Sequence, residues 1–307
     1  MIEAMMEYRV ALGLSPTTSK SQLKCFDRYC CDRRPDCDTI SKDLVFEWMG
    51  SLLEESSGNI SGHANAIRNL AEYMNAVGQP AYVLPSGFYP YKAGFAAYIF
   101  SDKELSALFQ AIDSLPRTRK SNEAKVAPVL FRLIYTCGLR PNEGRELRRE
   151  NINLDNGEIK IANTKKKKER LVVMSSDMLE LCRKFDSGLP PNRVYFFSQA
   201  NGKAYTASQI DKLIKKCWRN ANPGIENLPA VRTYDFRHRF ASARLNRWLD
   251  EGADLNNKLI YLMVYMGHDY IDETKYYVHI MPENLVKSAG IDWKALNAVI
   301  PEVSVWR

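Results

Sequence analysis

The spacing of apolar residues in the first third of the chain is helical. Residues 39–56 place Leu44, Val45, Trp48 and Leu52 on one helical face. Residues 13–35 contain a helix start at Ser15-Pro16 and end at a proline, and residues 59–78 end at a glycine. The pattern therefore predicts a small domain of three or more helices.

A stretch that breaks this pattern follows. Pro85, Gly87, Pro90 and Gly94 interrupt a run of aromatic residues, which is typical of a linker. We accordingly predict a helical domain at residues 1–84, a linker at 85–98, a larger domain at 99–290 and a C-terminal tail at 291–307.

The larger domain combines helices with one short pair of strands. Ser101 and Glu104 form a capping-box pattern, and an apolar helix is predicted at residues 126–138. Two runs rich in β-branched residues, 157–164 and 169–175, flank a turn of four lysines and predict a hairpin. Further helices are predicted at 175–185, 206–222, 235–250 and 256–267. The expected fold is mainly α with a small β-sheet.

Composition narrows the class of protein. The 307 residues are 45% hydrophobic and 26% charged, as in ordinary globular domains, which excludes collagen-like and disordered chains. No apolar run approaches the roughly 20 residues of a membrane helix, and Glu3 and Glu7 do not fit a signal peptide. We expect a cytoplasmic, nucleoid-associated protein with no membrane partner.

Charge is divided unevenly between the two predicted domains. Residues 1–98 carry 9 Lys and Arg against 11 Asp and Glu, whereas residues 99–307 carry 34 against 25. The net charges are −2 and +9. A basic excess attracts nucleic acid, although a solvated lysine-rich surface would give the same count.

The seven cysteines form no CxxC pair and have no histidine near enough to complete a zinc site. Reduced thiols are the interpretation that fits an intracellular chain. Metal binding remains an alternative only for the cluster from Cys25 to Cys37.

Several short motifs occur in a characteristic order. A Gly-Leu-Arg motif at residues 138–140 follows the apolar helix and precedes Glu143; the lysine hairpin and Tyr-Asp-Phe-Arg-His at 234–238 come next. Met-Gly-His ends at His268, and nine residues later stands Tyr277, within Tyr-Val-His. This order resembles the tyrosine recombinase, or phage integrase, family, whose members share GLR-xx-E, a hairpin lysine, H-xx-R-H, LGH and Y-x-H.

The resemblance covers residues 99 to about 285. The segment TKKKKERLVV aligns with the family's GKGxKERLVP and places Lys165 on the catalytic lysine. The opening of the chain looks like the helical, SAM-like core-binding domain of Xer-type enzymes, and we expect no added arm-binding domain ahead of residue 10. The tail at 291–307, with Trp293 and Leu296 on an apolar face, is expected to pack on a neighbouring protomer or, alternatively, in cis.

The resemblance implies a chemistry for these positions. Tyr277 would attack the DNA phosphodiester, Lys165 would protonate the leaving 5′-oxygen, and Glu143 would orient an arginine. Tyr234 stands where the family usually has histidine or lysine, and it carries no positive charge at neutral pH. The implied catalytic residues are Arg140, Lys165, Tyr234, Arg237, His268 and Tyr277. No metal, ATP or other cofactor is expected.

The implied function is a site-specific DNA recombinase that forms a 3′-phosphotyrosyl intermediate. Its expected partners are double-stranded DNA, three further copies of the chain in a homo-tetramer on paired sites, and accessory recombination proteins. Two alternatives remain: a DNA-binding accessory protein with weakened catalysis, which Tyr234 favours, and a type IB topoisomerase.

Overall fold

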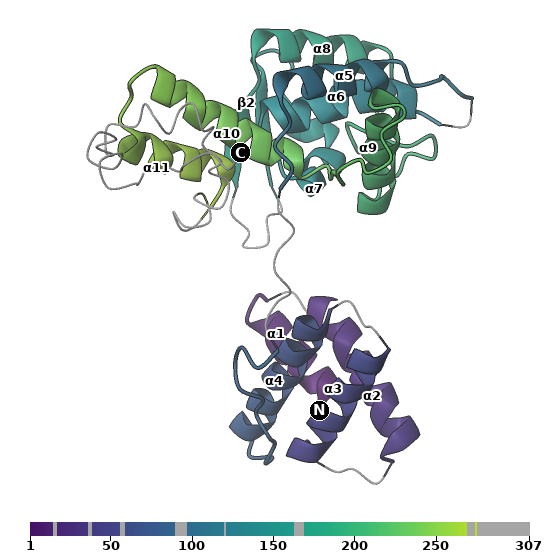
Figure 1. Ribbon diagram of the computed structural model, residues 1–307, viewed down its shortest axis with the longest axis vertical. Coiled ribbons are helices and arrows are strands. Elements are labelled where there is room, and N and C mark those ends of the chain that lie inside the picture. The colour runs from purple at the N-terminus through teal and green to yellow at the C-terminus, as the bar shows by residue number, and fades with distance from the viewer. Residues whose placement is uncertain are drawn as a thin grey trace, which may run out of the picture. The chain divides into compact units, whose positions relative to one another are not determined.

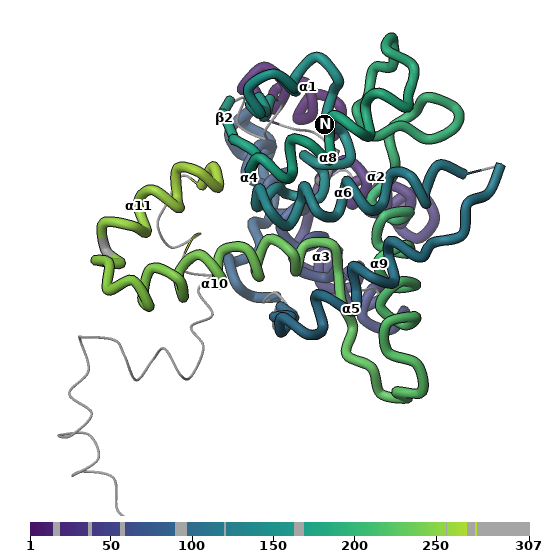
Figure 2. The backbone as a smooth tube through the Cα atoms, turned by 90° about the horizontal axis from the view of Figure 1, so that it is seen from above, coloured from purple at the N-terminus to yellow at the C-terminus, as the bar shows by residue number. Residues whose placement is uncertain are grey.

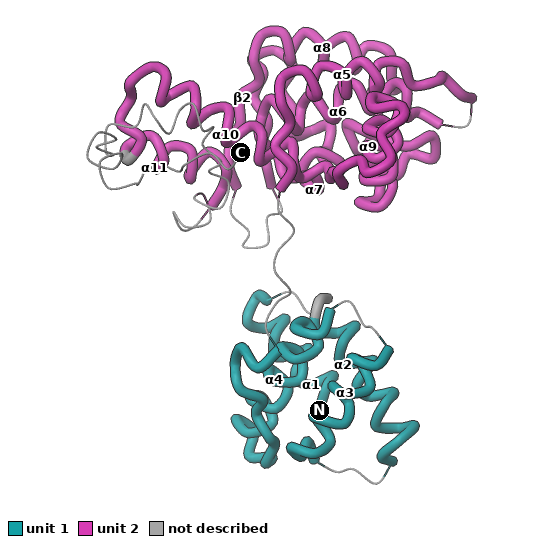
Figure 3. The backbone as a smooth tube through the Cα atoms, in the orientation of Figure 1, with its two compact units in different colours: residues 1–96 teal, residues 97–307 magenta. Residues whose placement is uncertain are grey.

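The structure, a computed structural model, describes residues 1–14, 17–35, 39–55, 59–89, 97–119, 121–162, 169–268 and Thr274. The chain divides into two compact units, Met1–Ala96 and Ala97–Arg307 (Figure 3). The boundary falls inside the predicted linker at 85–98. Each unit has its own hydrophobic core.

The first unit is a bundle of helices. Its described helices are α1 (Ile2–Ala11), α2 (Thr17–Arg33), α3 (Lys42–Glu54) and α4 (Ile60–Ala76). Helix α4 packs against the other three, and Trp48 of α3 is fully buried at the centre of the core. Ser41 begins α3 because its hydroxyl accepts a hydrogen bond from the Leu44 amide, 3.2 Å away.

The second unit holds most of the described elements. They are α5 (Asp102–Asp113), α6 (Glu123–Thr136), α7 (Pro141–Arg145), the 3-10 helix η1 (Arg149–Asn151), β1 (Glu158–Ile161), β2 (Arg170–Val173), α8 (Ser176–Ser187), α9 (Ala207–Ala221), α10 (Asp235–Asp250) and α11 (Leu255–Met266) (Figure 1).

Helix α6 is the central helix of this unit. It contacts α5, α8 and α10, so that apolar residues all around it are buried, among them Leu130, Phe131 and Ile134. Because it is surrounded in this way, its C-terminal end and the Gly-Leu-Arg turn that follows are held inside the unit. This fixes the place from which α7 starts.

Helices α10 and α11 form a hairpin beside this core. They lie side by side in both views, joined by a short turn at Gly252 (Figures 1 and 2). Phe240 and Leu245 of α10 pack on Leu262 and Met266 of α11. The C-terminal end of α11 is thereby brought back beside the first part of α10.

Strands β1 and β2 pair antiparallel, with Ile161 opposite Arg170. Ile159, Ile161 and Val172 face the core, while Leu171 on the other face is exposed. Strand β2 also contacts α11. The lysine turn at 165–168 lies outside the described residues.

The predicted fold class is confirmed: the chain is mainly helical with a small two-stranded sheet. The differences are local. Helices α1 and α7 were not predicted, and both strands are shorter than their β-branched runs. None of the helices described is long and apolar enough to cross a membrane.

Candidate active site

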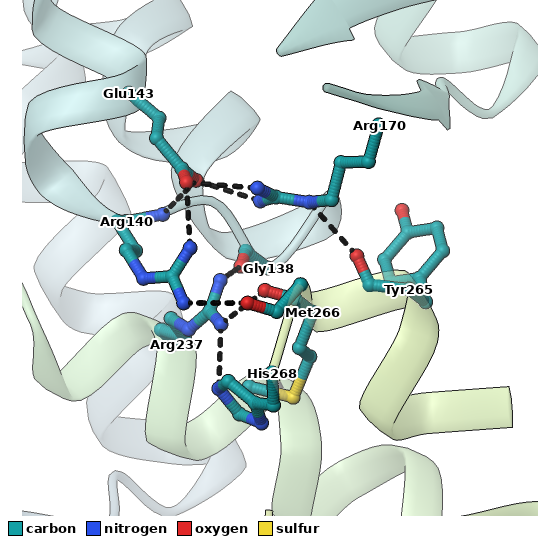
Figure 4. Close-up of polar contacts among 9 residues, drawn as sticks. Gly138, Arg140, Glu143, Arg170, Arg237, Tyr265, Met266 and His268 are labelled. Carbon is teal, nitrogen blue, oxygen red and sulfur yellow. Dashed lines mark hydrogen bonds and ion pairs between the residues drawn. The ribbon is translucent and has the colours of Figure 1, made fainter. Parts of the chain in front are cut away.

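Three turns bring the motif residues together. Arg140 stands at the residue before α7, Arg237 lies in the first turn of α10, and His268 follows the C-terminus of α11. Figure 4 shows these three side chains around one another, with Glu143 above Arg140. Lys165 and Tyr277, the two other central residues of the prediction, lie outside the described residues.

Arg237 is fully buried and is held by acceptors from two helix ends. Its Nη1 donates to the Gly138 carbonyl at 2.6 Å, and its Nη2 donates to the Met266 carbonyl at 2.7 Å. The last carbonyls of a helix lack partners within the helix and lie at the negative end of its dipole. The ends of α6 and α11 are therefore suited to stabilise a buried guanidinium without cancelling its charge.

The C-terminus of α11 binds two further arginines. Arg140 Nη2 donates to the Gly267 carbonyl at 3.0 Å, and Arg170 Nε donates to the Tyr265 carbonyl at 3.0 Å. Three successive carbonyls of one helix end thus accept hydrogen bonds from three different arginines. This arrangement places the three guanidinium groups next to each other.

Glycine is required at the turn that carries the Gly138 carbonyl. Gly138 has a φ of +59°, and a Cβ there would lie 2.4 Å from the Phe240 ring. The Leu139 amide donates to the Ile134 carbonyl at 3.1 Å, which closes the end of α6 and aims the chain into α7. The Gly-Leu-Arg sequence therefore has a structural reason as well as a chemical one.

His268 is buried and has a partner on each ring nitrogen. Its Nε2 lies 2.9 Å from Arg237 Nη2, and its Nδ1 lies 2.8 Å from Thr274 Oγ1. A guanidinium can only donate, so Nε2 accepts and the proton of the neutral ring is on Nδ1. Burial, reinforced by Arg237, Arg140 and Arg170, lowers the pKa of His268 to about 3. The ring is therefore neutral at physiological pH.

Glu143 is the carboxylate within this group of arginines. It accepts from the Arg140 amide and Arg140 Nη1, and also from both Nη atoms of Arg170 (Figure 4). Burial alone would raise its pKa, but the hydrogen bonds and charge of Arg170 outweigh burial and lower the pKa to about 2. Glu143 is ionised across the physiological range.

The charges in this cluster do not balance. Arg140, Arg170 and Arg237 carry three positive charges, and Glu143 carries one negative charge. Among these described residues the sum is +2. A partly buried site of this charge, with several guanidinium donors, suits a phosphate group.

Tyr234, the residue that departs from the family pattern, immediately precedes α10. It is partly buried, packs on the α10–α11 apolar cluster, and its ring centroid lies 5.8 Å from that of His238. It therefore sits one helical turn before Arg237.

The motif comparison did not point to Arg170 or Thr274. Arg170 belongs to the aligned segment TKKKKERLVV, but no pattern in that segment relates it to Glu143, which lies 27 residues earlier. Thr274 lies six residues after His268, and no pattern in the sequence relates the two side chains. Both were visible only in three dimensions.

The cysteines do not form a metal site in the part of the chain that the structure describes. Cys25, Cys30 and Cys31 lie on α2 and form no disulfide bond, and Cys137, Cys182 and Cys217 are buried in the second unit. No group of three potential ligands gathers among the described residues. Cys37 lies outside them.

Comparison with known proteins agrees with the motifs. Residues 99–284 match the phage integrase family. The integrase/recombinase y4rE of Sinorhizobium fredii is 26% identical over 286 residues, which cover 90% of each chain. The tyrosine recombinase XerD of Staphylococcus aureus is 25% identical over 304 residues, covering 94% of this chain and 96% of XerD.

Solved structures show the same fold. The Tn1549 transposon integrase in complex with a circular intermediate DNA has a TM-score of 0.66 at 15% identity, covering 93% of this chain and 97% of that one. A lambda integrase tetramer bound to a Holliday junction has a TM-score of 0.65 at 12% identity, covering 90% and 76%. With the matched family domain spanning more than half its length, the chain belongs to the phage integrase family and is a Xer-like tyrosine recombinase, an enzyme of site-specific DNA recombination.

Proposed function

We propose that this recombinase cleaves and rejoins double-stranded DNA through a 3′-phosphotyrosyl intermediate, with Tyr277 as the nucleophile. The observation that supports the proposal most is the cluster of Arg140, Arg237 and His268 at the ends of α6 and α11, with its excess of positive charge. Phosphoryl transfer depends chiefly on positioning and on neutralising charge at the non-bridging oxygens. The cluster has the donors that such neutralisation needs.

Each arginine has a defined part in this proposal. The planar guanidinium groups of Arg140 and Arg237 would donate to the two non-bridging oxygens of the scissile phosphate. Arg237 is already fixed by two carbonyls, so it loses little freedom when the phosphate arrives. Glu143 would hold Arg140 in place through the two bonds described above.

His268 would donate a hydrogen bond to a phosphate oxygen. The Thr274 hydroxyl, which lies beside the other ring nitrogen, makes this donation possible. In the DNA-free arrangement Nε2 accepts from Arg237, so donation to phosphate requires the proton to move from Nδ1 to Nε2. The Thr274 hydroxyl can accept from Nδ1–H or donate to an unprotonated Nδ1. One side chain therefore supports both tautomers of a ring that stays neutral.

The bond changes follow from the motif assignment. The Tyr277 oxygen gives its proton to solvent water and bonds to phosphorus, the bond from phosphorus to the 5′-oxygen breaks, and Lys165 gives that oxygen a proton. The phosphotyrosyl ester conserves the energy of the phosphodiester, so a second 5′-hydroxyl reverses the reaction without ATP. Tyr234, which has only a phenolic hydroxyl to offer, would donate one hydrogen bond to the phosphate.

The assembly proposed is a homo-tetramer on two paired duplexes. Residues 1–84 would act as the core-binding domain and residues 99–290 as the catalytic domain, and both would bind the duplex. The tail at 291–307 would pack on a neighbouring protomer. The lambda integrase relative, which is a tetramer on a Holliday junction, supports this arrangement.

The nucleophile can be tested with two adjacent tyrosines as matched variants. The substrate is a nicked suicide duplex made from the DNA that flanks the gene. Tyr277→Phe removes the attacking oxygen and keeps the ring, so the covalent adduct should disappear while DNA binding remains. Tyr276→Phe should still form the 3′ adduct, because the nine-residue step from His268 and the Tyr-Val-His context both select Tyr277. An adduct with Tyr277→Phe, or none with the wild type, would show the proposal to be wrong.

A further inference from the structure

Arg170 is a third guanidinium in the cluster, and the proposed chemistry gives it no part. It is the first residue of β2, and its side chain is 10% exposed. Nη1 and Nη2 donate to the two oxygens of Glu143 at 2.8 Å and 2.7 Å. Its Nε donates to the Tyr265 carbonyl at the end of α11, so the group is held at all three nitrogens.

Glu143 connects Arg170 to Arg140. Oε1 accepts from both Arg140 Nη1 and Arg170 Nη1, and Oε2 accepts from both the Arg140 amide and Arg170 Nη2 (Figure 4). The one carboxylate is therefore shared by two arginines. Arg170 makes the two-pronged contact, and the Arg140 side chain makes a single one.

This sharing matters for the charge available to a substrate. With Arg170 absent, the ionised Glu143 would pair with Arg140 alone, and a phosphate at Arg140 would meet a buried carboxylate behind the guanidinium. With Arg170 present, the carboxylate is neutralised from its other side. The attraction between Arg140 and a phosphate is then not cancelled at short range, where the low local dielectric makes such charges strong.

We propose that Arg170 is a positioning residue of the recombinase: it is the charge partner of Glu143, and it thereby leaves the guanidinium of Arg140 available to the scissile phosphate. This inference rests on the proposed function, since it assigns Arg140 to the phosphate. It differs from a purely structural role for Arg170, in which the side chain only fastens β2 to α11.

The two roles predict different outcomes for a double variant. Arg170→Gln leaves Glu143 ionised without its partner, and we expect adduct formation at saturating DNA to slow by about 10- to 100-fold, the usual loss for a buried charge-assisted contact. Adding Glu143→Gln removes the negative charge that Arg170 neutralised, while the amide oxygen can still accept a hydrogen bond from Arg140. The double variant should therefore react at least ~5-fold faster than Arg170→Gln alone, a coupling that contacts of this kind commonly reach. A structural fastening predicts no such recovery.

A modified DNA substrate tests whether Arg170 acts through the charge interaction between Arg140 and the scissile phosphate. Replacing one non-bridging oxygen of the scissile phosphate by a methyl group removes the negative charge that Arg140 would neutralise. On this methylphosphonate the loss caused by Arg170→Gln should shrink to less than ~3-fold, because the developing charge to be stabilised is smaller. A substrate with sulfur at the 5′ leaving position, which needs little protonation, should show the full loss.

Arg149 provides the matched control. It also makes a two-pronged contact with a carboxylate, from Nε and Nη2 to Asp186 at 2.8 Å and 2.9 Å, and its Nη1 donates to a backbone carbonyl, that of Ile152. It lies in η1, outside the arginine cluster. Arg149→Gln should react at the wild-type rate. Arg170→Lys keeps the positive charge but cannot make the two-pronged contact, so its rate of adduct formation should lie between those of the wild type and Arg170→Gln.

A measurement without DNA separates this inference from the proposed function. Sulfate, used as a phosphate mimic, should raise the melting temperature of the wild type and of Arg149→Gln, and should raise that of Arg170→Gln much less. If the wild type forms no adduct, the proposed function is wrong. The sulfate measurement still tests whether Arg170 leaves the positive charge of Arg140 available to an anion. The inference itself is overturned if Arg170→Gln reacts normally, if Glu143→Gln gives no recovery, or if sulfate stabilises all three proteins equally.

Discussion

At the scale of single residues, the buried, neutral His268 ring makes the unfolding free energy of the protein depend on pH. Its pKa is about 3 in the folded protein, against an ordinary value of 6.5, because burial and three arginines disfavour the charged ring. As pH falls below 6.5 the unfolded chain takes up a proton and the folded protein does not. Stability is therefore complete above about 6.5 and is lost as pH falls from there toward 3.

We expect His268→Asn to weaken this dependence in the second unit. Between pH 6 and pH 4 the wild-type unfolding free energy should fall by about 1 kcal/mol per pH unit from this group alone. The variant should show a correspondingly flatter curve. Hydrogen exchange of the α6 and α10 amides in the full-length protein measures the unfolding free energy of the second unit at each pH, since both helices belong to that unit.

His63 serves as the control for that experiment. Its pKa is also lowered by burial, but it lies in α4 of the first unit, against the ring of Trp48. His63→Asn should leave the pH dependence of α6 and α10 exchange as in the wild type. Identical curves for the wild type and His268→Asn would contradict the neutral, buried ring described here.

The motifs contain Arg140, Glu143, Arg237 and His268, and the structure places these four side chains in one cluster at the ends of α6 and α11. Arg170 was missed for a physical reason. Its partners are Glu143 and the Tyr265 carbonyl, 27 and 95 residues away, and neither leaves a pattern in the sequence around Arg170. The catalytic roles of all six motif residues stay predictions: Arg140, Lys165, Tyr234, Arg237, His268 and Tyr277.

At the scale of secondary-structure elements, the long amphipathic helices were predictable and the short elements were not. Helix α10 has the predicted bounds, Asp235–Asp250, and it buries apolar residues along its length, among them Phe236, Phe240 and Leu245. Helix α1 buries only Met5 and Met6, so its apolar residues follow no clear stripe. Helix α7 is five residues long, too short for any period to show.

The turn after α6 is the element on which the cluster depends, and Gly138→Ala tests it. The substitution combines a φ of +59° with a Cβ placed 2.4 Å from the Phe240 ring. We expect a loss of about 3 kcal/mol in the unfolding free energy of the second unit, from backbone strain plus overpacking. Urea unfolding measures the loss.

Gly252→Ala is the matched control for this turn. Gly252 has a similar φ of +67°, but a Cβ there meets no atom within 4 Å. Its substitution should cost only the backbone strain, about 1 kcal/mol. Equal losses at the two glycines would mean that the close approach of Phe240 to Gly138 contributes nothing.

At the scale of the whole molecule, the two units differ in charge as well as in fold. The positive excess of residues 99–307 includes four exposed cations on one face of α9: Lys212, Lys215, Lys216 and Arg219. Their spacing places them opposite the buried face that carries Leu213 and Trp218. Such a row can neutralise successive phosphates along a duplex.

We therefore expect DNA binding to weaken steeply with salt, and the α9 row to account for part of that dependence. Each phosphate neutralised contributes about 0.9 to the slope of log K against log salt, because bound counterions are released. Replacing the four cations by glutamine should reduce the slope by about 1 to 3, with little change in the helical circular dichroism spectrum, since all four side chains are exposed. Fluorescence anisotropy on a labelled duplex between low and physiological salt gives both slopes. A wild-type affinity that barely changes with salt would contradict a phosphate-binding surface on this chain, and an unchanged slope in the variant would place that surface away from α9.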